Sequence, residues 1–484
     1  MRYFYEKIHE TIKNSQALFY SYNDQKYSYS ECFRNIQKIN SLLHKSRNQR
    51  IALYASKSFN SYCAIFSILL SGNTWIPLSP VQPDKRTLDM MRVAAPHMIF
   101  ADCSLPELIH NHAGEKEISI YNINEIIEKE KCREFELGEF HKDDIAYIMF
   151  TSGSTGLPKG VPMTHDNYIN FVENALEILP FNKHEVFSDY HDFGFDISIF
   201  YLFCAILTES AFAPAIRDEE RLYFLDNAIK NRVTVFSSVP STISHIKRLR
   251  PDSQIETSIR IMFLCGEPFR LDVLQYCYEN MRVEHVYNFY GLTETGVENF
   301  YHQCCSDDVK RFEQQGFVPI GKPLKGNNII ITDEKELLIS GCQVTPGYLG
   351  DIRRERFEII DGVKWFHSGD IVEKFEDVYF CKGRMDSQVK LNGYRIELMD
   401  IEAHMGIFKG VSEAVCFVNE ISGQKYLVGY AESADCDAKE LKGFLRERLP
   451  SYMIPKKIYI MGEFPRNKSG KIDRVRIKEH CNKE

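Results

Sequence analysis

Short apolar segments rich in β-branched and aromatic residues alternate with helical segments through much of this 484-residue chain. Residues 50–80 show the pattern most clearly, with a strand, an apolar helix, a stop at Gly72-Asn73 and a second strand that ends in prolines. Such a unit places its two strands parallel in one sheet. Predicted strands at 233–239 and 260–266 end in small residues, as binding-site strands of open α/β sheets do. The alternation predicts layered α/β structure.

The pattern changes twice along the chain. After residue 318 the segments become β-rich, which indicates a small barrel-like subdomain, and beyond Asp386 a compact α+β unit of about one hundred residues is expected. We therefore predict an α/β and α+β fold with a large N-terminal domain (1–384) and a small C-terminal domain (385–484). Within the large domain, residues 1–50 are predicted to be mostly helical with one short hairpin, and the polar residues 110–143 to form a surface excursion.

Composition excludes several classes of protein. The formal net charge of −8 argues against a nucleic-acid scaffold, and no apolar run is long enough to span a bilayer. The N-terminal residues lack the apolar core of an export signal. The fourteen cysteines contain no C-x-x-C motif of a zinc or redox site. We therefore expect a cytoplasmic protein with reduced thiols, with no membrane or nucleic-acid partner.

A glycine-rich stretch, YIMFTSGSTGLPKG at 147–160, follows a predicted strand and precedes a predicted helix with Thr164 as its N-cap. Small residues of this kind cannot pack a core, but their backbone N–H groups and hydroxyls can surround an anion, and Lys159 adds a positive charge. The spacing is not that of the Walker A motif. A phosphate cradle is the favoured interpretation, and a flexible surface loop is the alternative.

Four other stretches are rich in polar chemistry. YGLTETG (290–296) could stack a base and hold a hard cation, or form a turn with a solvated glutamate. Asp370 in HSGDIV could bind ribose hydroxyls or stabilise a turn. GRMDSQVKLNGYRIEL (383–398) has the composition of a linker that must bend. Lys471 in PRNKSGKIDR could be a mobile cation or an ordinary surface lysine.

Together with GNTWIPLSPVQPDKR, FGFDISIF, LCGE and ISGCQVTPGYL, these motifs resemble the adenylate-forming superfamily over nearly the whole chain. That superfamily includes acyl-CoA synthetases, firefly luciferase and adenylation domains of nonribosomal peptide synthetases. The resemblance implies the acyl-adenylate-forming fold, whose small C-terminal domain is mobile. FDIS and QVKLNGYRIEL look like the amino-acid-activating branch, and LCGE and SYMIPKKIYI are similar to D-alanine–carrier-protein ligases.

The resemblance implies a two-step reaction with ATP and Mg²⁺. An amino acid is first activated as aminoacyl-AMP and is then transferred to the phosphopantetheine thiol of a separate carrier protein. In the matched catalytic positions, Thr293 contacts the α-phosphate, Glu294 binds Mg²⁺, and Lys471 bridges the substrate carboxylate and the α-phosphate. Asp386 matches the hinge between the domains. Matched positions assign nucleotide binding to Thr151, Ser152, Gly153, Ser154, Thr155, Gly156, Lys159, Gly266, Glu267, Asn288, Phe289, Tyr290, Gly291, Asp370 and Arg384.

The resemblance also assigns a substrate pocket in which Asp196 pairs with the α-ammonium group; the alternative for Asp196 is a helix N-cap. Bulky Phe289 and the thiol of Cys265 favour a small amino acid. Glu298 would pair with a basic or hydroxylated side chain, or turn toward solvent. The remaining matched pocket positions are Ile197, Phe200, Ser237, Phe263 and Val297.

Two further hypotheses remain at this stage. An acyl- or aryl-CoA ligase would load free coenzyme A and would not need the carboxylate of Asp196. A non-catalytic nucleotide-binding protein would bind ATP without turnover, although the retained polar residues of the matched motifs argue against it.

Overall fold

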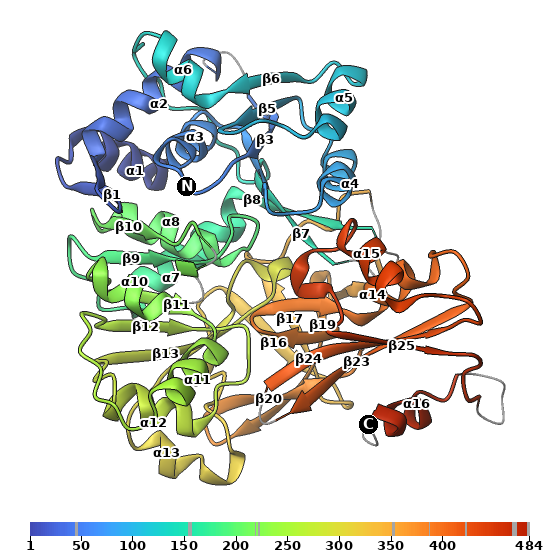
Figure 1. The fold of residues 1–484 in the computed structure, drawn as a ribbon. Helices are drawn as coiled ribbons and strands as arrows, with labels where there is room; N and C mark the ends of the chain where they lie inside the picture. The colour runs from blue at the N-terminus through green and yellow to red at the C-terminus, as the bar shows by residue number, and fades with distance from the viewer. Residues whose placement is uncertain are drawn as a thin grey trace.

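The structure is a computed structural model that describes residues 1–43, 47–152, 157–217, 219–220, 223–350, 354–386, 388–421, 424–466 and 472–481. A large N-terminal domain holds two wide sheets and a third, antiparallel sheet, and a small C-terminal domain lies beside it (Figure 1). This arrangement confirms the predicted fold class. No helix among the described residues is long and apolar enough to cross a membrane.

The first wide sheet has six strands in the order β6-β5-β3-β4-β7-β8. Neighbouring strands are parallel except for the antiparallel β7–β8 pair, and the predicted β3-α3-β4 unit is present. The strands are β3 (Arg50–Tyr54), β4 (Thr74–Leu78), β5 (Met98–Ala101), β6 (Ser119–Asn122), β7 (Ile145–Thr151) and β8 (Lys159–Thr164).

The second wide sheet has nine strands in the order β15-β14-β13-β12-β11-β9-β10-β1-β2. Its central strands are parallel, and the predicted N-terminal hairpin, which turns at Asn23, forms one edge. The strands are β1 (Leu18–Tyr22), β2 (Gln25–Ser28), β9 (Val186–Asp189), β10 (Ala211–Pro214), β11 (Val235–Ser238), β12 (Ile261–Leu264), β13 (His285–Tyr290), β14 (Phe300–Gln303) and β15 (Lys322–Pro323).

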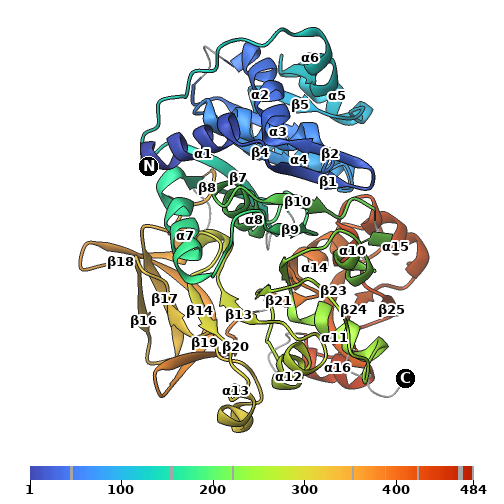
Figure 2. The same ribbon diagram turned by 90° about the vertical axis from the view of Figure 1, so that its left-hand side faces the viewer.

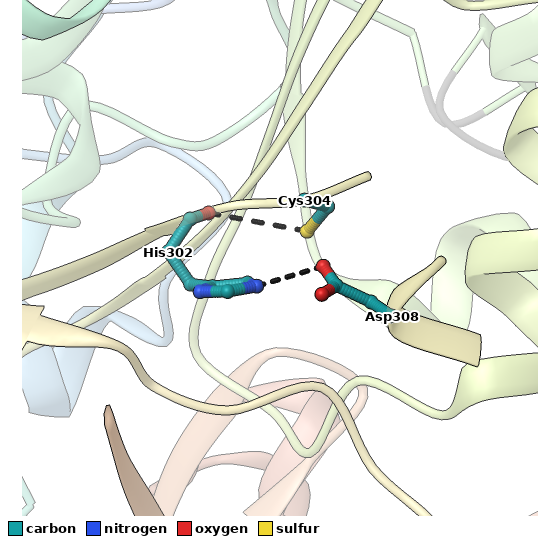
Figure 3. Close-up of side chains that lie close together, drawn as sticks. All are labelled: His302, Cys304 and Asp308. Atoms are coloured by element: carbon teal, nitrogen blue, oxygen red, sulfur yellow. Dashed lines mark hydrogen bonds and ion pairs between the residues drawn. The ribbon is translucent and has the colours of Figure 1, made fainter. Parts of the chain in front are cut away.

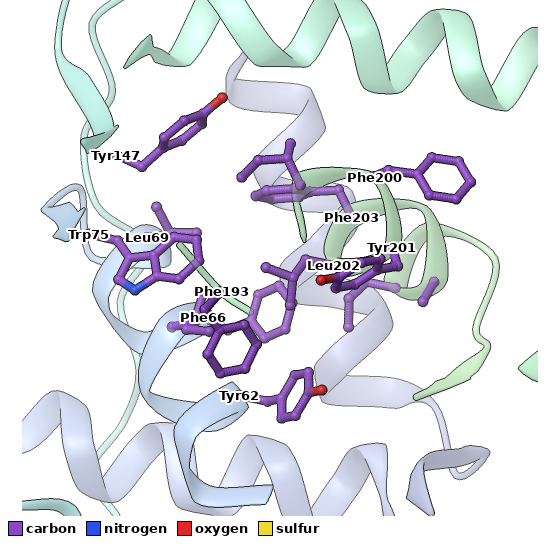
Figure 4. Close-up of a cluster of buried hydrophobic side chains, with 14 of the residues drawn as sticks. Tyr62, Phe66, Leu69, Trp75, Tyr147, Phe193, Phe200, Tyr201, Leu202 and Phe203 are labelled. Carbon is purple, nitrogen blue, oxygen red and sulfur yellow. The ribbon is translucent and has the colours of Figure 1, made fainter. Parts of the chain in front are cut away.

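The largest hydrophobic core lies between these two sheets and includes residues of six helices that pack there (Figures 2 and 4). Trp75 and Tyr147 enter it from the six-stranded sheet, and Tyr62 enters it from α3. Helix α3 is apolar on nearly all sides because it is buried on nearly all sides. The six core helices are α1 (Arg2–Asn14), α2 (Tyr29–Leu43), α3 (Phe59–Leu70), α6 (Ile123–Lys129), α7 (His165–Ile178) and α8 (Ile197–Leu207).

Other helices cover the outer faces or connect the strands of the N-terminal domain (Figures 1 and 2). They are α4 (Asp84–Ala94), α5 (Glu107–Glu115), α10 (Phe224–Lys230), α11 (Pro240–Leu249), α12 (Leu271–Glu279) and α13 (Asp308–Arg311), with the 3₁₀ turn η1 (Thr293–Thr295) after β13.

The β-rich part after residue 318 forms a five-stranded antiparallel sheet in which β20 pairs with β19. Its strands are β16 (Asn327–Ile331), β17 (Glu336–Gly341), β18 (Phe357–Ile360), β19 (Val363–Phe375) and β20 (Val378–Arg384). The C-terminal domain then begins with a two-stranded hairpin, β21 (Gln388–Leu391) and β22 (Tyr394–Glu397).

The rest of the C-terminal domain is a three-stranded sheet with helices packed on it. Buried Leu441 and Leu445 of α15 form the predicted apolar stripe. The elements are α14 (Leu398–Gly406), β23 (Glu413–Ile421), β24 (Gln424–Glu432), α15 (Ala438–Arg446), β25 (Lys457–Met461) and α16 (Arg474–Cys481).

Two local predictions were incomplete. The polar segment 110–143 contains β6, an edge strand of the six-stranded sheet, and α6, so only part of it is an irregular excursion. A strand also separates the glycine-rich stretch from its helix: Lys159 opens β8, and α7 starts only after Thr164, which forms a capping box with Asn167. The stretch therefore joins two antiparallel strands and does not lead directly into a helix N-terminus.

Candidate active site

One pocket lies between the N-terminal domain and the β21–β22 hairpin, at the ends of β4, β7, β12 and β13. The hairpin residues Lys390, Gly393 and Arg395 contribute to its wall, as does Tyr452 of the C-terminal domain. Of the residues predicted from sequence, those that line it are Thr151, Ser152, Asp196, Ile197, Cys265, Gly266, Gly291, Thr293, Val297 and Glu298.

The predicted phosphate cradle is only partly visible. Gly153, Ser154, Thr155 and Gly156 lie outside the described residues, as does Lys471. At the flanks of the stretch, the Thr151 hydroxyl is buried with no hydrogen-bond partner among the described residues, and Lys159 is 6% exposed. Thr151 lines the pocket and is paired with Lys159 across β7 and β8. A buried orphan hydroxyl next to a buried ammonium fits an anionic ligand such as the phosphates of ATP.

Glu294 is ionised and buried in η1, next to the pocket. Its Oε1 accepts a 2.7 Å hydrogen bond from the Tyr348 hydroxyl, and its Oε2 lies 2.6 Å from Nη1 of Arg395. Burial opposes ionisation, but Arg395 and Tyr348 outweigh it and lower the pKa of Glu294 to about 2. A permanently ionised carboxylate at this position fits the predicted Mg²⁺ ligand.

Three of the predicted nucleotide-binding residues, Tyr290, Asp370 and Arg384, form one hydrogen-bonded group. The Tyr290 hydroxyl donates to Asp370, and Nη1 of Arg384 lies 2.7 Å from the other carboxylate oxygen of Asp370. Asn288 donates its amide N–H to the Pro319 carbonyl at 2.8 Å, while its Oδ1 is buried without a partner among the described residues. That free acceptor suits the amino group of adenine. The Lys390 ammonium lies 5.2 Å from the centre of the Tyr290 ring.

Asp196 sits at the N-cap position of α8, yet its side chain makes no capping hydrogen bond. It lines the pocket, as does Thr293, whose side chain partly offsets the cost of burying the Asp196 charge and so lowers its pKa. Desolvation raises its pKa and Glu294 adds to the rise, while Arg395 opposes it without cancelling it. The carboxylate is therefore not fully balanced by any cation among the described residues. The ammonium group of a substrate would supply the balance.

Glu298 does not turn toward solvent. It is 5% exposed, lines the pocket, and has its Oε2 without a partner among the described residues. Desolvation raises the pKa of Glu298 to about 8; Asp196 raises it further, while the Cys265 thiol and Lys390 oppose the rise. Burial also raises the pKa of Cys265, so its thiol stays protonated beside Glu298. At neutral pH the pocket therefore presents Asp196 beside an uncharged Glu298.

Three predicted pocket aromatics stack behind the pocket and do not line it. The Phe263 ring lies between Phe200, at 4.2 Å between ring centres, and Phe289, at 4.1 Å. All three are buried. Ser237 is also buried, and its hydroxyl has no partner among the described residues. The stack leaves no apolar channel for a long side chain in that direction.

The assigned nucleotide residue Glu267 serves another contact in this structure. Its Oε1 accepts a 2.7 Å hydrogen bond from the Gly393 amide, and its Oε2 accepts one from the Ser241 amide at the start of α11. Gly393 has φ +81°, and a Cβ there would lie 2.7 Å from Val239 Cγ1. Glycine is therefore required for the hairpin to approach this closely.

The predicted hinge residue Asp386 is held by two arginines. Its Oδ1 lies 2.7 Å from Nε of Arg384, and its Oδ2 lies 2.7 Å from Nη2 of Arg356. Burial alone would raise the pKa of Asp386, but the two guanidinium groups outweigh it and hold that pKa well below its usual range. A network of charges thus fixes the chain just before the hairpin.

A second cluster of metal-ligand residue types lies away from the pocket, where His302, Cys304 and Asp308 meet between β14 and α13 (Figure 3). His302 Nε2 and Asp308 Oδ2 are 2.8 Å apart, and the Cys305 amide donates to the same oxygen at 2.9 Å. A tetrahedral zinc ion would hold such nitrogen and oxygen ligands about 3.3 Å apart. The observed spacing is that of a hydrogen bond that ties β14 to α13.

Sequence reasoning missed Arg395 and Tyr348 as partners of Glu294. Arg395 lies in the stretch predicted to be a linker that bends. Its positive charge was the feature of the sequence that could have pointed to a carboxylate partner. Its partner is 101 positions away, so only the arrangement of the two domains reveals the contact.

Comparison with known proteins agrees with this geometry. The family described as AMP-binding enzyme matches residues 6–349, and the family described as AMP-binding enzyme C-terminal domain matches residues 400–471. The chain belongs to the AMP-binding enzyme family. It is thus an acyl-adenylate-forming ligase, as the motifs predict.

Relatives and solved structures of this AMP-binding enzyme span several activities. A D-alanine–D-alanyl carrier protein ligase of Staphylococcus epidermidis is 27% identical, with 98% of both chains covered. A linear gramicidin synthase of Brevibacillus parabrevis is 29% identical over 97% of this chain, but the chain spans only 10% of that relative's length. The adenylation domain AlmE of Vibrio cholerae, solved with glycyl-adenosine-5′-phosphate, has the same fold, with a TM-score of 0.83 at 22% identity and 99% and 98% coverage.

Proposed function

We propose that this protein uses ATP to activate a small amino acid as aminoacyl-AMP and then transfers the aminoacyl group to the phosphopantetheine thiol of a carrier protein. The observation that carries this proposal is Asp196, a desolvated carboxylate that faces the pocket, makes no capping hydrogen bond and is not fully balanced by a cation among the described residues. A carboxylate in that state fits the α-ammonium group of an amino acid.

In the first half-reaction a carboxylate oxygen of the substrate bonds to the α-phosphorus of ATP, and pyrophosphate leaves. Thr151, Ser152 and Lys159 hold the departing phosphates, and Glu294 is the residue that would hold Mg²⁺. Bound Mg²⁺ would supply charge neutralisation for the leaving group. Tyr290 and Asn288 place the adenine, and Asp370 and Arg384 the ribose.

In the second half-reaction the thiol sulfur bonds to the acyl carbon and AMP leaves. We assign Lys471 to the first step and the hairpin around Gly393 to the second, with Asp386 as the hinge between the domains at 384/385. The hairpin contacts support this assignment, because Gly393 lines the pocket and is held against the N-terminal domain by Glu267.

Two features support a small, uncharged side chain. The stacked rings of Phe200, Phe263 and Phe289 fill the space behind the pocket. Glu298 is uncharged at neutral pH, so of these two acids Asp196 alone needs an ammonium group, and a second cation on the side chain is not required. The free Oε2 of Glu298 can still accept a hydrogen bond from a hydroxyl such as that of serine.

The relatives support the same substrate class. D-alanine–D-alanyl carrier protein ligases match over almost their whole length, and AlmE was solved with a glycyl adenylate. Both names refer to small amino acids.

The test offers the enzyme ATP, one amino acid and two thiol acceptors, a phosphopantetheinylated carrier protein and free coenzyme A. Intact-mass spectrometry of the carrier is expected to show the added mass of alanine, glycine or serine, with no acyl-coenzyme A. Formation of acyl-coenzyme A from aryl or fatty acids, with Asp196→Ala as active as the native protein, would instead establish a coenzyme A ligase.

A further inference from the structure

The β21–β22 hairpin places one positive and one negative side chain against side chains of the opposite charge in the N-terminal domain. Nη1 of Arg395 lies 2.6 Å from Oε2 of Glu294, and Oε1 of Glu397 lies 3.5 Å from Nζ of Lys159. The side chains of Glu294, Lys159 and Glu397 are at most 8% exposed, and that of Arg395 is 17% exposed. Both pairs are therefore shielded from water.

The hairpin backbone also forms hydrogen bonds with the Ser152 hydroxyl. The Ser152 hydroxyl accepts a 3.1 Å hydrogen bond from the Glu397 amide and donates to the Arg395 carbonyl at 3.5 Å. A hydroxyl predicted to hold phosphate oxygens thus makes its hydrogen bonds with the hairpin.

Gln388 holds the two hairpin charges in a fixed relation. Its Oε1 accepts a 2.7 Å hydrogen bond from Nε of Arg395, and its Nε2 donates to Oε1 of Glu397 at 2.6 Å. Gln388 and Glu397 also face each other across the two strands. Arg395 and Glu397 are therefore held in a fixed arrangement when the hairpin contacts the N-terminal domain.

Buried charges need partners, because removing a charge from water without compensation is costly. In the proposed function, the partner of Glu294 is Mg²⁺, and the partner of Ser152 and Lys159 is the pyrophosphate that leaves. In this structure Glu294 is paired with the Arg395 guanidinium, which is positive like Mg²⁺. Lys159 is paired with the Glu397 carboxylate, which is negative like pyrophosphate.

We propose that Arg395 and Glu397 replace the magnesium–pyrophosphate product: Arg395 takes the place of Mg²⁺ at Glu294, and Glu397 takes the place of pyrophosphate at Ser152 and Lys159. The inference rests on the proposed function. It goes beyond domain movement, since it makes hairpin docking and magnesium–pyrophosphate binding mutually exclusive. Each then weakens the other by the same factor.

Hydrogen–deuterium exchange of the full chain tests the exclusion directly. The amides of Gly393 and Glu397 donate to Glu267 and Ser152 of the other domain, so they report on docking. Adding Mg²⁺ and pyrophosphate is expected to accelerate exchange in peptides covering 388–397 at least tenfold, while peptides of β23 and β24 stay unchanged. Mg²⁺ with inorganic phosphate is the ligand control.

Calorimetry of pyrophosphate binding gives the reciprocal measurement. Glu397→Gln removes the carboxylate that faces Lys159, so magnesium–pyrophosphate is expected to bind at least several-fold more tightly than to the native chain. Lys85→Gln is the matched control, because it breaks an exposed interdomain ion pair, Lys85–Glu447, without touching the phosphate site. Its affinity for pyrophosphate is expected to stay within twofold of native.

The outcomes separate the inference from the proposed function. Binding of magnesium–pyrophosphate with no change in hairpin exchange shows that both fit together, and it overturns the substitution while leaving the proposed function intact. Failure of pyrophosphate to bind at all overturns both.

Discussion

Glu298→Gln tests whether the pocket holds an uncharged acid. The pKa of Glu298 rises from an ordinary 4.5 to about 8, because burial disfavours the charged form. Below pH 4.5 the folded and unfolded states are both protonated, so the shift has no effect. Between pH 4.5 and 8 the unfolded chain releases the proton and the folded chain keeps it, so the free energy of unfolding falls as pH rises.

The size of the effect follows from that pKa. Each pH unit in this window costs about 1.4 kcal/mol, which gives about 3 kcal/mol at pH 7. At pH 8 half of the folded molecules are already ionised, so the total is about 4 kcal/mol. Glutamine has the same shape and no charge in either state. The stability of Glu298→Gln relative to the native chain is therefore expected to increase by about 3.5 kcal/mol between pH 5 and pH 8.

Urea unfolding of both chains at pH 5, 6, 7 and 8 measures this difference. Glu334→Gln, which changes an exposed glutamate, is the control, and its stability difference is expected to stay near zero at every pH. A stability difference for Glu298→Gln that does not change with pH would refute the reasoning, since it would mean that Glu298 titrates alike in the folded and unfolded states.

Three other predictions concern single contacts. Asp196→Ala should lower kcat/KM for the amino acid, with a loss of about 2–5 kcal/mol of transition-state stabilisation, while calorimetry still shows ATP binding. An unchanged kcat/KM would mean that Asp196 does not contact the ammonium group. Gly393→Ala places a Cβ 2.7 Å from Val239, so carrier loading should slow at least tenfold with pyrophosphate exchange retained, and loss of both or neither would count against the hairpin's role. His302→Ala should destabilise the chain by about 1–3 kcal/mol, and EDTA should have the same effect on the melting temperatures of the native chain and of His302→Ala; a shift seen in the native chain alone would mean that the His302 cluster binds metal after all.

The large-scale fold was predictable because its signals are local. Residues 50–80 place a stop at Gly72-Asn73 between two apolar strands, and the structure has the expected parallel β3-α3-β4 unit. Strand β8 was missed because all six of its residues are buried, so no alternation of polar and apolar residues marks it. Strand β6 was missed for the opposite reason: it is short and largely exposed.

The site was predictable only in part. Motifs identified Asp196, Thr293 and Cys265, and the structure brings them to one pocket. The sequence left Glu298 open between a pocket role and a solvent role, and only its burial decides between them. Contacts such as Arg395 with Glu294 join two domains, and no periodicity within either segment encodes them.

Formation of an adenylate from a small amino acid is the step on which the proposed function depends. It is tested most directly by exchange of labelled pyrophosphate into ATP by the native chain, measured with the twenty amino acids, small D-isomers and a few aryl acids. We predict exchange that depends on alanine, glycine or serine, in either configuration, and that falls steeply as the side chain grows. Exchange with aryl acids alone, or with none of the acids, would contradict the proposed function.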